Sequence, residues 1–383
     1  MKIWTRFVTV CLVLTVGLLA GCSSEVKIGA IVSRTGGTSP YGQSVAKGLD
    51  LAVEEINASG GVLGGPLTLI YRDDESRPDT GVAAAEDLIQ NEGVRLIIGA
   101  VSSSVTKAVA EVAQKHSVVL MSPSASAPDL SMAGDYIFRN YPSDIIEGTA
   151  MAEFAKTNGV RKVVIFAMDE NFGRGLTEVF RRRFESKSRK VLETFYFPAD
   201  ASEEVFAPMI DQVRELEPQG VYIIAYVNQM ATLLTQLKAA GCMALKMGSG
   251  AVTEETLALA GEAADHLVYA KPKLDIESND PKVASFVKAF TEKYGGAPDV
   301  FAAHAYDALN AMVMAIEEAD MAHPDSVKLQ LLNLDFEGAA GKTAFDERGD
   351  VTRYPQLFVL HENESMLVDK FEEAGGTLPI PGT

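Results

Sequence analysis

Cysteine and tryptophan are scarce in this chain of 383 residues, which contains three cysteines and one tryptophan. Cys11 and Cys22 both lie in the first 22 residues, so Cys242 is the one cysteine of the remaining sequence. A single cysteine cannot form an intrachain disulfide, so a hydrophobic core must hold the fold together. Cys242 follows Gly241 at the end of a segment with helical periodicity, and we interpret it as a packing residue.

Signatures of metal, nucleotide and hydrolase sites are also missing. The sequence has no G-x-G-x-x-G, no G-x-x-x-x-G-K-[ST] and no G-x-S-x-G element. The adjacent acids Asp73-Asp74 and Asp169-Glu170 end predicted strands, where carboxylates more often cap helices or stay solvated. We therefore predict a protein that is not an enzyme and has no cofactor. We also predict no metal site, because none of five histidines has metal-ligand spacing: His116, His266, His304, His323 and His361.

Basic residues are outnumbered, with 34 lysines and arginines against 52 aspartates and glutamates and a net charge of −18 at pH 7. Such a surface repels phosphate groups, which argues against nucleic acid as a partner.

A long hydrophobic run occurs only at the N-terminus. Lys2 and Arg6 precede a run of 14 residues, 7–20, which is shorter than the roughly 20 residues of a membrane-spanning helix. The run closes on Leu19-Ala20-Gly21-Cys22, a pattern typical of a bacterial lipobox. We predict that residues 1–21 are a signal peptide, that Cys22 is lipidated, and that the mature protein is extracytoplasmic, at a membrane in the periplasm or on the cell surface. The alternative is a buried core segment that contains a cysteine.

Beyond Cys22, short apolar strands alternate with amphipathic helices. In one helix Leu49, Val53 and Ile56 share one face, and Asp50 lies on the other. Alternation of this kind predicts parallel sheets covered by helices. The first series has strands at Val26–Ser33, Leu67–Arg72, Val94–Gly99 and Val118–Met121, and the second at Lys162–Ala167, Val191–Phe197, Val221–Tyr226, Leu245–Gly248 and Leu267–Ala270. A final apolar strand is predicted at Gln356–His361.

The predicted fold class is α/β, with two doubly wound, Rossmann-like parallel-sheet lobes. Three segments are candidate crossings between the lobes: Arg139–Asp144, Lys271–Lys273 and Arg353–Pro355. They predict a lobe 1 of residues 25–142 and 273–354 and a lobe 2 of residues 143–272 and 355–383.

Polar loops follow two neighbouring strands of the first series. Residues 99–106 contain Ser102, Ser103 and Ser104 before a helix, whose positive end favours a carboxylate. Residues 122–128 contain Ser124 and Ser126. Ligands of open α/β sheets bind at the carboxyl ends of strands, so these loops predict a binding site; the alternative is that the serines cap helices and turns. A third loop, 34–42, contains Tyr41, which can add an apolar wall.

The chain resembles the type I periplasmic binding proteins, in particular the branched-chain amino-acid-binding (Leu/Ile/Val-binding-like) receptors of ABC transporters. The resemblance spans nearly everything after Val26. The matching short motifs are Ile28-Gly29-Ala30, Thr35-Gly36, Tyr41-Gly42 and Ala305-Tyr306-Asp307-Ala308. The matching longer stretches are residues 52–65 (AVEEINASGGVLGG), 71–74, 98–104, 122–130 and 169–176.

The resemblance implies two lobes joined by three crossing strands that close on a ligand. It implies that Ser103 and the loop Ser124-Ala125-Ser126, next to Ser102, hold a ligand carboxylate, and that Ser124 and Ser126 contact an ammonium. Tyr41, Phe172 and Tyr226 correspond to aromatic positions of the family's cleft.

One position departs from the family pattern: Gly250 stands where the family has a glutamate that faces the ammonium. A buried ammonium without a countercharge would cost several kcal/mol. Three alternatives stay open. Asp169 or Glu170 substitutes for the glutamate, the aromatic residues supply cation–π contacts, or the ligand has no ammonium.

We therefore expect a solute-binding lipoprotein that captures a small carboxylate- or amide-bearing ligand, an amino acid or a related organic acid, by hinge closure. The expected partner is an ABC permease in the inner membrane. A ligand-sensing receptor subunit is the alternative that the fold does not distinguish, and an enzyme acting on a small metabolite is a further one.

Overall fold

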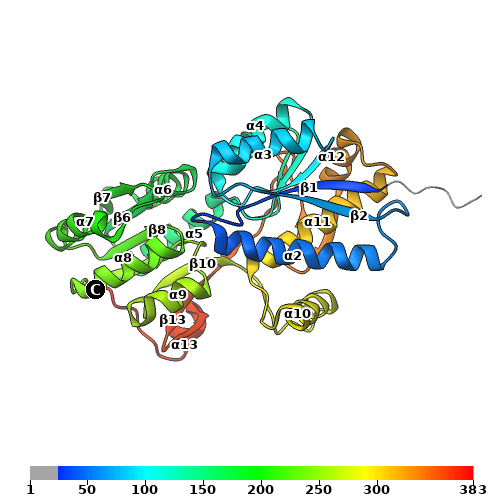
Figure 1. Cartoon of the computed structure of the whole chain (residues 1–383). Coiled ribbons are helices and arrows are strands. Elements are labelled where there is room, and N and C mark those ends of the chain that lie inside the picture. Colours follow the sequence, from blue (N-terminus) through cyan, green and yellow to red (C-terminus); the bar gives the residue numbers. More distant parts are fainter. Residues whose placement is uncertain (1–24, 383) are drawn as a thin grey trace, which may run out of the picture.

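The structure is a computed structural model that describes residues 25–382. The predicted signal peptide and Cys22 lie outside the described residues. We keep the names lobe 1 and lobe 2 for the predicted residue ranges. Figure 1 shows two bodies side by side, each built around its own sheet, with helix α5 (Asp144–Thr157) at their junction.

The first sheet is parallel, in the order β2-β1-β3-β4-β5. Side chains alternate between its faces because strands have a period of two. Ile28, Ala30 and Val32 face one cluster with α2 and α11, whereas Ile31 faces another with α3 and α4. The elements of lobe 1 around this sheet are β1 (Val26–Val32), α2 (Ser39–Ala58), β2 (Leu67–Asp73), α3 (Pro78–Gln90), β3 (Leu96–Ile98), α4 (Ser103–Lys115), β4 (Val119–Ser122), η1 (Pro128–Met132), β5 (Ile137–Arg139), α11 (Val300–Ala319) and α12 (Pro324–Asn333).

The second sheet has the order β14-β13-β10-β9-β8-β6-β7, and its strands β13 and β14 are antiparallel to their neighbours. Helices again cover both faces: Ile165 and Tyr222 face the cluster with α5 and α6, and Val164 and Ile223 face α7, α8 and α9. The elements are β6 (Lys162–Met168), α6 (Asn171–Phe184), β7 (Lys190–Phe197), α7 (Glu203–Leu216), β8 (Gly220–Ile224), α8 (Val227–Ala239), β9 (Leu245–Gly248), α9 (Glu254–Ala260), η2 (Gly261–Ala264), β10 (Val268–Pro272), β13 (Pro355–His361), β14 (Glu364–Leu367) and α13 (Val368–Glu373).

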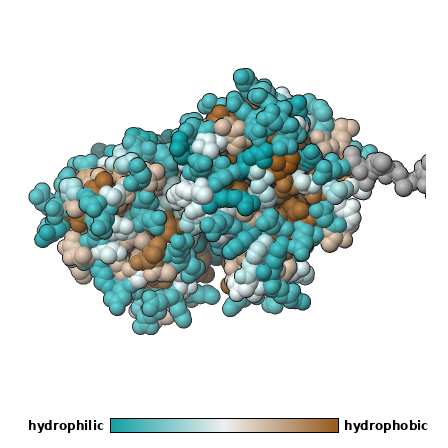
Figure 2. Space-filling view, viewed as in Figure 1, coloured by the Kyte–Doolittle hydropathy of each residue, from teal (hydrophilic) through white to brown (hydrophobic). Residues whose placement is uncertain are grey.

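Helix α10 (Pro281–Tyr294) and the hairpin of β11 (Asp335–Gly338) and β12 (Gly341–Ala344) complete the fold. Among residues 25–382, no helix combines the length and apolar character that a bilayer span requires. The face drawn in Figure 2 is mostly hydrophilic, and its hydrophobic residues occur in small separate groups.

The α/β class and the two helix-covered sheets are confirmed. The predicted loop 34–42 is wrong at its end: α2 begins at Ser39, because Pro40 starts the helix, where its missing N–H costs nothing. Tyr41 therefore lies in the first turn of a helix and not in a loop. The sequence pattern also missed four short strands, β5, β11, β12 and β14.

Candidate ligand-binding site between the lobes

Residues of both lobes line a small pocket with a cavity volume of about 40 Å³. Of the nine residues predicted from the sequence, the structure brings eight together here: Tyr41, Ser102, Ser103, Ser124, Ser126, Phe172, Tyr226 and Gly250. The ninth, Ala125, is buried in a cluster with Ala127 and Leu130 and does not line the pocket. Sequence analysis missed Glu147, Tyr141 and Phe301, which also line it.

Ser103 connects the two serine loops. Its Oγ accepts hydrogen bonds from the backbone amides of Ser126, at 3.2 Å, and Ala127, at 3.1 Å. A serine hydroxyl has two lone pairs and one hydrogen, so these contacts leave the hydrogen free to be donated. Ser103 is also the first residue of α4, where the helix dipole favours negative charge. The site can therefore hold a ligand carboxylate at this point.

The other serines have partly structural roles. Ser102 caps α4, and its Oγ accepts a hydrogen bond from the amide of Val105 at 3.3 Å. Ser124 Oγ donates to the carbonyl of Val101 at 2.8 Å. Both residues still face the pocket, but their hydroxyls already serve the backbone of the two loops. The capping alternative of the sequence analysis thus holds for Ser102.

Aromatic rings form the apolar wall of the pocket. Phe172 and Tyr226 of lobe 2 stack with ring centroids 5.6 Å apart, and Tyr41 of lobe 1 lies 5.6 Å from Tyr226. Tyr41 Oη donates a 2.8 Å hydrogen bond to the carbonyl of Ala251 in lobe 2. Burial raises the pKa of Tyr41 well above its usual range, so its hydroxyl keeps its proton and remains a hydrogen-bond donor. Because the Tyr41 hydrogen bond and ring contacts join lobe 1 to lobe 2, the two lobes are closed on each other in this structure.

Glu147 of α5 occupies the space beside Gly250. The Gly250 amide donates to Glu147 Oε1 at 2.9 Å, and a Cβ at position 250 would lie 2.6 Å from Glu147 Oε2. Tyr222 Oη donates to the same Oε1 at 3.4 Å. Glu147 is only 8% exposed and lines the pocket. A carboxyl group from α5 thus lies beside residue 250, and a side chain at position 250 would displace it.

Asp144, one turn before Glu147, adds a second buried carboxylate. Burial raises the pKa of Asp144 to about 7, opposed first by the Ser126 hydroxyl and then by the Arg139 charge. Apart from the Ser126 hydroxyl, its two oxygens have no hydrogen-bond partner among the described residues. Arg139 itself pairs with Asp350 at 2.8 Å.

The pKa of Glu147 is raised well above its usual range, first by burial and then by the Asp144 charge. In the described part of the chain, no basic side chain is among the groups that set this pKa. Two neighbouring buried carboxyl groups, of which Glu147 has no basic partner among the described residues, favour a bound proton or a bound cation.

The acids that the sequence analysis considered as substitutes lie elsewhere. Asp169 pairs with Arg174 at 2.5 Å, with both side chains largely exposed. Glu170 is half-buried, and its Oε2 accepts a 3.1 Å hydrogen bond from Ser104 Oγ across the lobes. Burial raises the pKa of Glu170, and its hydrogen bonds with Tyr226 and Ser104 lower it. Neither Asp169 nor Glu170 lines the pocket, whereas Glu147 does.

Comparison with known proteins shows the family to which the chain belongs. A periplasmic binding protein family model matches residues 25–359. The leucine-, isoleucine-, valine-, threonine- and alanine-binding protein of Pseudomonas aeruginosa is 30% identical over 335 residues, which cover 87% of this chain and 88% of that protein.

Two solved structures show the same fold. The leucine-binding protein LivK of Thermotoga maritima superposes with a TM-score of 0.84 at 26% identity, over 93% of this chain and 99% of that one. An ABC transporter solute-binding protein of R. palustris in complex with benzoate has a TM-score of 0.83 at 22% identity, over 94% of this chain and 97% of that one. The chain therefore belongs to the periplasmic binding protein family, whose members are extracytoplasmic solute-binding receptors and serve ABC transporters.

Proposed function

We propose that the ligand is a zwitterionic α-amino acid with a small or medium-sized apolar side chain. Ser103 and the N-terminus of α4 would hold the carboxylate, and Glu147 would face the ammonium. The aromatic wall of Tyr41, Phe172 and Tyr226 would cover the side chain. The observation that carries the proposal is the buried Glu147 carboxylate, which lines the pocket without a cationic partner among the described residues.

The electrostatics of the pocket favour this ligand over an organic acid without an amine. An amine-free anion would add a further negative charge beside the carboxyl groups of Glu147 and Asp144, unless a proton neutralises the anion or these groups. An ammonium supplies the missing countercharge directly. The fold alone does not decide the question, because its solved relatives include both a leucine-binding protein and a protein in complex with benzoate. The ligands in the name of the Pseudomonas protein all carry an ammonium, which supports the same choice.

Closure of the lobes is the proposed mechanism of capture. The serine loops belong to lobe 1, whereas Glu147, Phe172 and Tyr226 belong to lobe 2, so one molecule must contact both lobes to gain all of its interactions. A ligand shifts a conformational equilibrium only through its difference in affinity for the two states. A molecule with only a carboxylate or only an amine should therefore close the protein poorly.

In the cell, we propose a lipid anchor at Cys22 and delivery of the closed form to ABC permease subunits in the inner membrane. No chemical step on the ligand is needed in this cycle.

A thermal-shift screen tests the ligand class. Leucine, isoleucine, valine, threonine and alanine would be compared at pH 7.5 with their des-amino acids, such as 4-methylpentanoate, and with the matching amines. A ligand at 100 times its Kd should stabilise the protein by about 2.7 kcal/mol. We expect large shifts for one or more amino acids and none for their des-amino partners. Larger shifts for the des-amino acids would contradict the proposal.

A further inference from the structure

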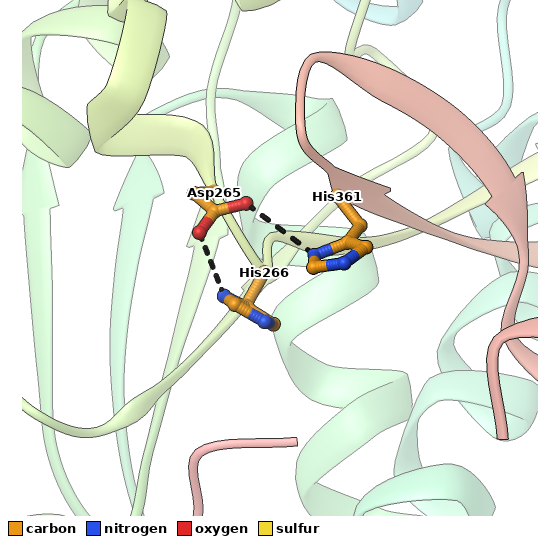
Figure 3. Close-up of side chains that lie close together, drawn as sticks. All are labelled: Asp265, His266 and His361. Atoms are coloured by element: carbon orange, nitrogen blue, oxygen red, sulfur yellow. Dashed lines mark ion pairs between the residues drawn. The ribbon is translucent and has the colours of Figure 1, made fainter. Parts of the chain in front are cut away.

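Three side chains with metal-binding atoms converge where strands β10 and β13 pair in lobe 2 (Figure 3). Asp265 and His266 lie just before β10, separated from it by Leu267, and His361 is the last residue of β13. Asp265 Oδ2 lies 2.9 Å from His266 Nδ1, and Asp265 Oδ1 lies 4.0 Å from His361 Nδ1. One ligand atom from each residue lies within 4.8 Å of the other two. Spacing along the sequence did not predict this cluster, because 94 positions separate the last two residues.

The backbone fixes the relative positions of the three residues. The His266 amide donates to the Leu360 carbonyl at 2.7 Å, and the Leu360 amide donates to the Leu267 carbonyl at 3.0 Å. The Phe371 ring of α13 lies edge-on to both imidazoles, with centroids 6.0 Å from His266 and 5.2 Å from His361. The three side chains thus need only side-chain rotation to approach one ion.

Two of the ligand atoms are without a hydrogen bond. Asp265 Oδ1 and His361 Nδ1 are shielded from solvent, and neither has a hydrogen-bond partner among residues 25–382. Their separation of 4.0 Å is too long for a direct hydrogen bond. A metal ion bound to both atoms would satisfy both lone pairs, because metal–nitrogen and metal–oxygen bonds at such sites are about 2.0–2.2 Å long.

We propose that Asp265, His266 and His361 bind one divalent transition-metal ion of the Zn²⁺ type. Two imidazoles and one carboxylate suit Zn²⁺ and its first-row neighbours, whereas Mg²⁺ and Ca²⁺ prefer oxygen ligands alone. All three side chains are partly exposed, with 28% of His266, 36% of His361 and 45% of Asp265 accessible. Water therefore has access to complete the coordination of the ion.

The ion would connect the segment before β10 to the end of β13. None of its three ligands lines the interlobe pocket, so the ion should stabilise lobe 2 without changing the affinity for the transported solute. It would act as a cross-link in a chain whose described part contains only one cysteine.

Titration calorimetry of tag-free protein with ZnCl₂ tests this inference. We expect one Zn²⁺ per wild-type chain, with an affinity that falls at least tenfold in His361→Ala and in Asp265→Asn. His323→Ala is the matched control, because His323 and Asp325 form a comparable pair, with 3.9 Å between Nδ1 and Oδ2, that is not part of a cluster of three. Its Zn²⁺ binding should equal that of the wild type. MgCl₂ and CaCl₂ should give no binding to the cluster.

Visible absorption of the Co²⁺-loaded protein gives a second readout. We expect d–d bands in the wild type and in His323→Ala, and their loss in His361→Ala. Circular dichroism would verify that each variant is folded, and His266→Gln would replace any variant that is not. Absence of Zn²⁺ binding to the wild type, or equal affinity in the wild type and the cluster variants, would overturn the inference. Neither result depends on the identity of the pocket's ligand, so these experiments test the metal site independently of the proposed function.

Discussion

The backbone amide of Gly250 donates a 2.9 Å hydrogen bond to Glu147 Oε1, and this contact joins the loop after β9 to the first turns of α5. Because glycine has no Cβ, the carboxylate can occupy the space beside the backbone of residue 250. The two residues therefore form one unit: the glycine creates the room, and the glutamate brings the charge.

Gly250→Ala should weaken ligand binding. The added Cβ would lie 2.6 Å from Glu147 Oε2, so the carboxylate would have to leave its position. We expect at least a tenfold loss of affinity for the best amino acid in titration calorimetry. Gly296→Ala is the control, because a Cβ there meets no atom within 4 Å. Unchanged affinity in Gly250→Ala would show that the position of Glu147 does not matter for binding.

Ser103→Ala should lower affinity more than Ser102→Ala. The first change removes a free hydroxyl donor together with the acceptor of the Ser126 and Ala127 amides. The second removes a helix cap, which costs about 1 kcal/mol of stability. Calorimetry and thermal unfolding of both variants separate the two effects. Equal affinities in the two variants would argue against Ser103 as a carboxylate ligand.

Tyr41→Phe should shift the protein toward its open form. The substitution keeps the ring but removes the 2.8 Å hydrogen bond to the Ala251 carbonyl across the lobes. A hydrogen bond of this kind contributes about 1 kcal/mol, which corresponds to roughly a fivefold change in affinity if closure accompanies binding. Small-angle scattering and calorimetry would measure the two effects. Tyr196→Phe in β7, outside both the pocket and the predicted crossings, should change neither.

The ligand-free protein should lose stability as pH rises from about 4 to about 7. The pKa of Asp144 is about 7 in the folded state, and that of Glu147 is raised as well, so the folded state binds more protons than the unfolded chain in this range. Stability falls with pH wherever the folded state holds the extra protons. Thermal unfolding of the wild type and of Asp144→Asn would measure this, and the variant should show the shallower pH dependence.

Amino-acid affinity should change with pH in the opposite direction. An ammonium needs an ionised carboxylate, so affinity should rise from pH 5 to pH 7.5 as Asp144, whose pKa is about 7, loses its proton. Binding near pH 6 should release protons, which calorimetry detects as a dependence of the measured heat on the buffer's ionisation enthalpy. Proton uptake on binding would contradict this account.

Much of the fold and of the pocket could be predicted because the signals are local. Helical and strand periodicity located most elements, and the polar loops after two neighbouring strands located Ser103 and Ser126 on one side of the pocket. The charge partner could not be found in this way. Glu147 lies in the first turns of a helix, where acids commonly interact with the helix dipole, and its burial depends on packing against Tyr222 and Gly250. His361 could not be found from local sequence signals either, because it lies near Asp265 only through strand pairing.

The most direct test of the central claim is calorimetry of wild type and Glu147→Gln with leucine, or the best amino acid of the screen, and with its des-amino acid. Glu153→Gln on the exposed part of α5 serves as the control. We predict that Glu147→Gln loses at least tenfold in affinity for the amino acid, and that the preference for the amine-bearing ligand shrinks. A Glu147→Gln protein that binds the amino acid as tightly as the wild type would contradict the account.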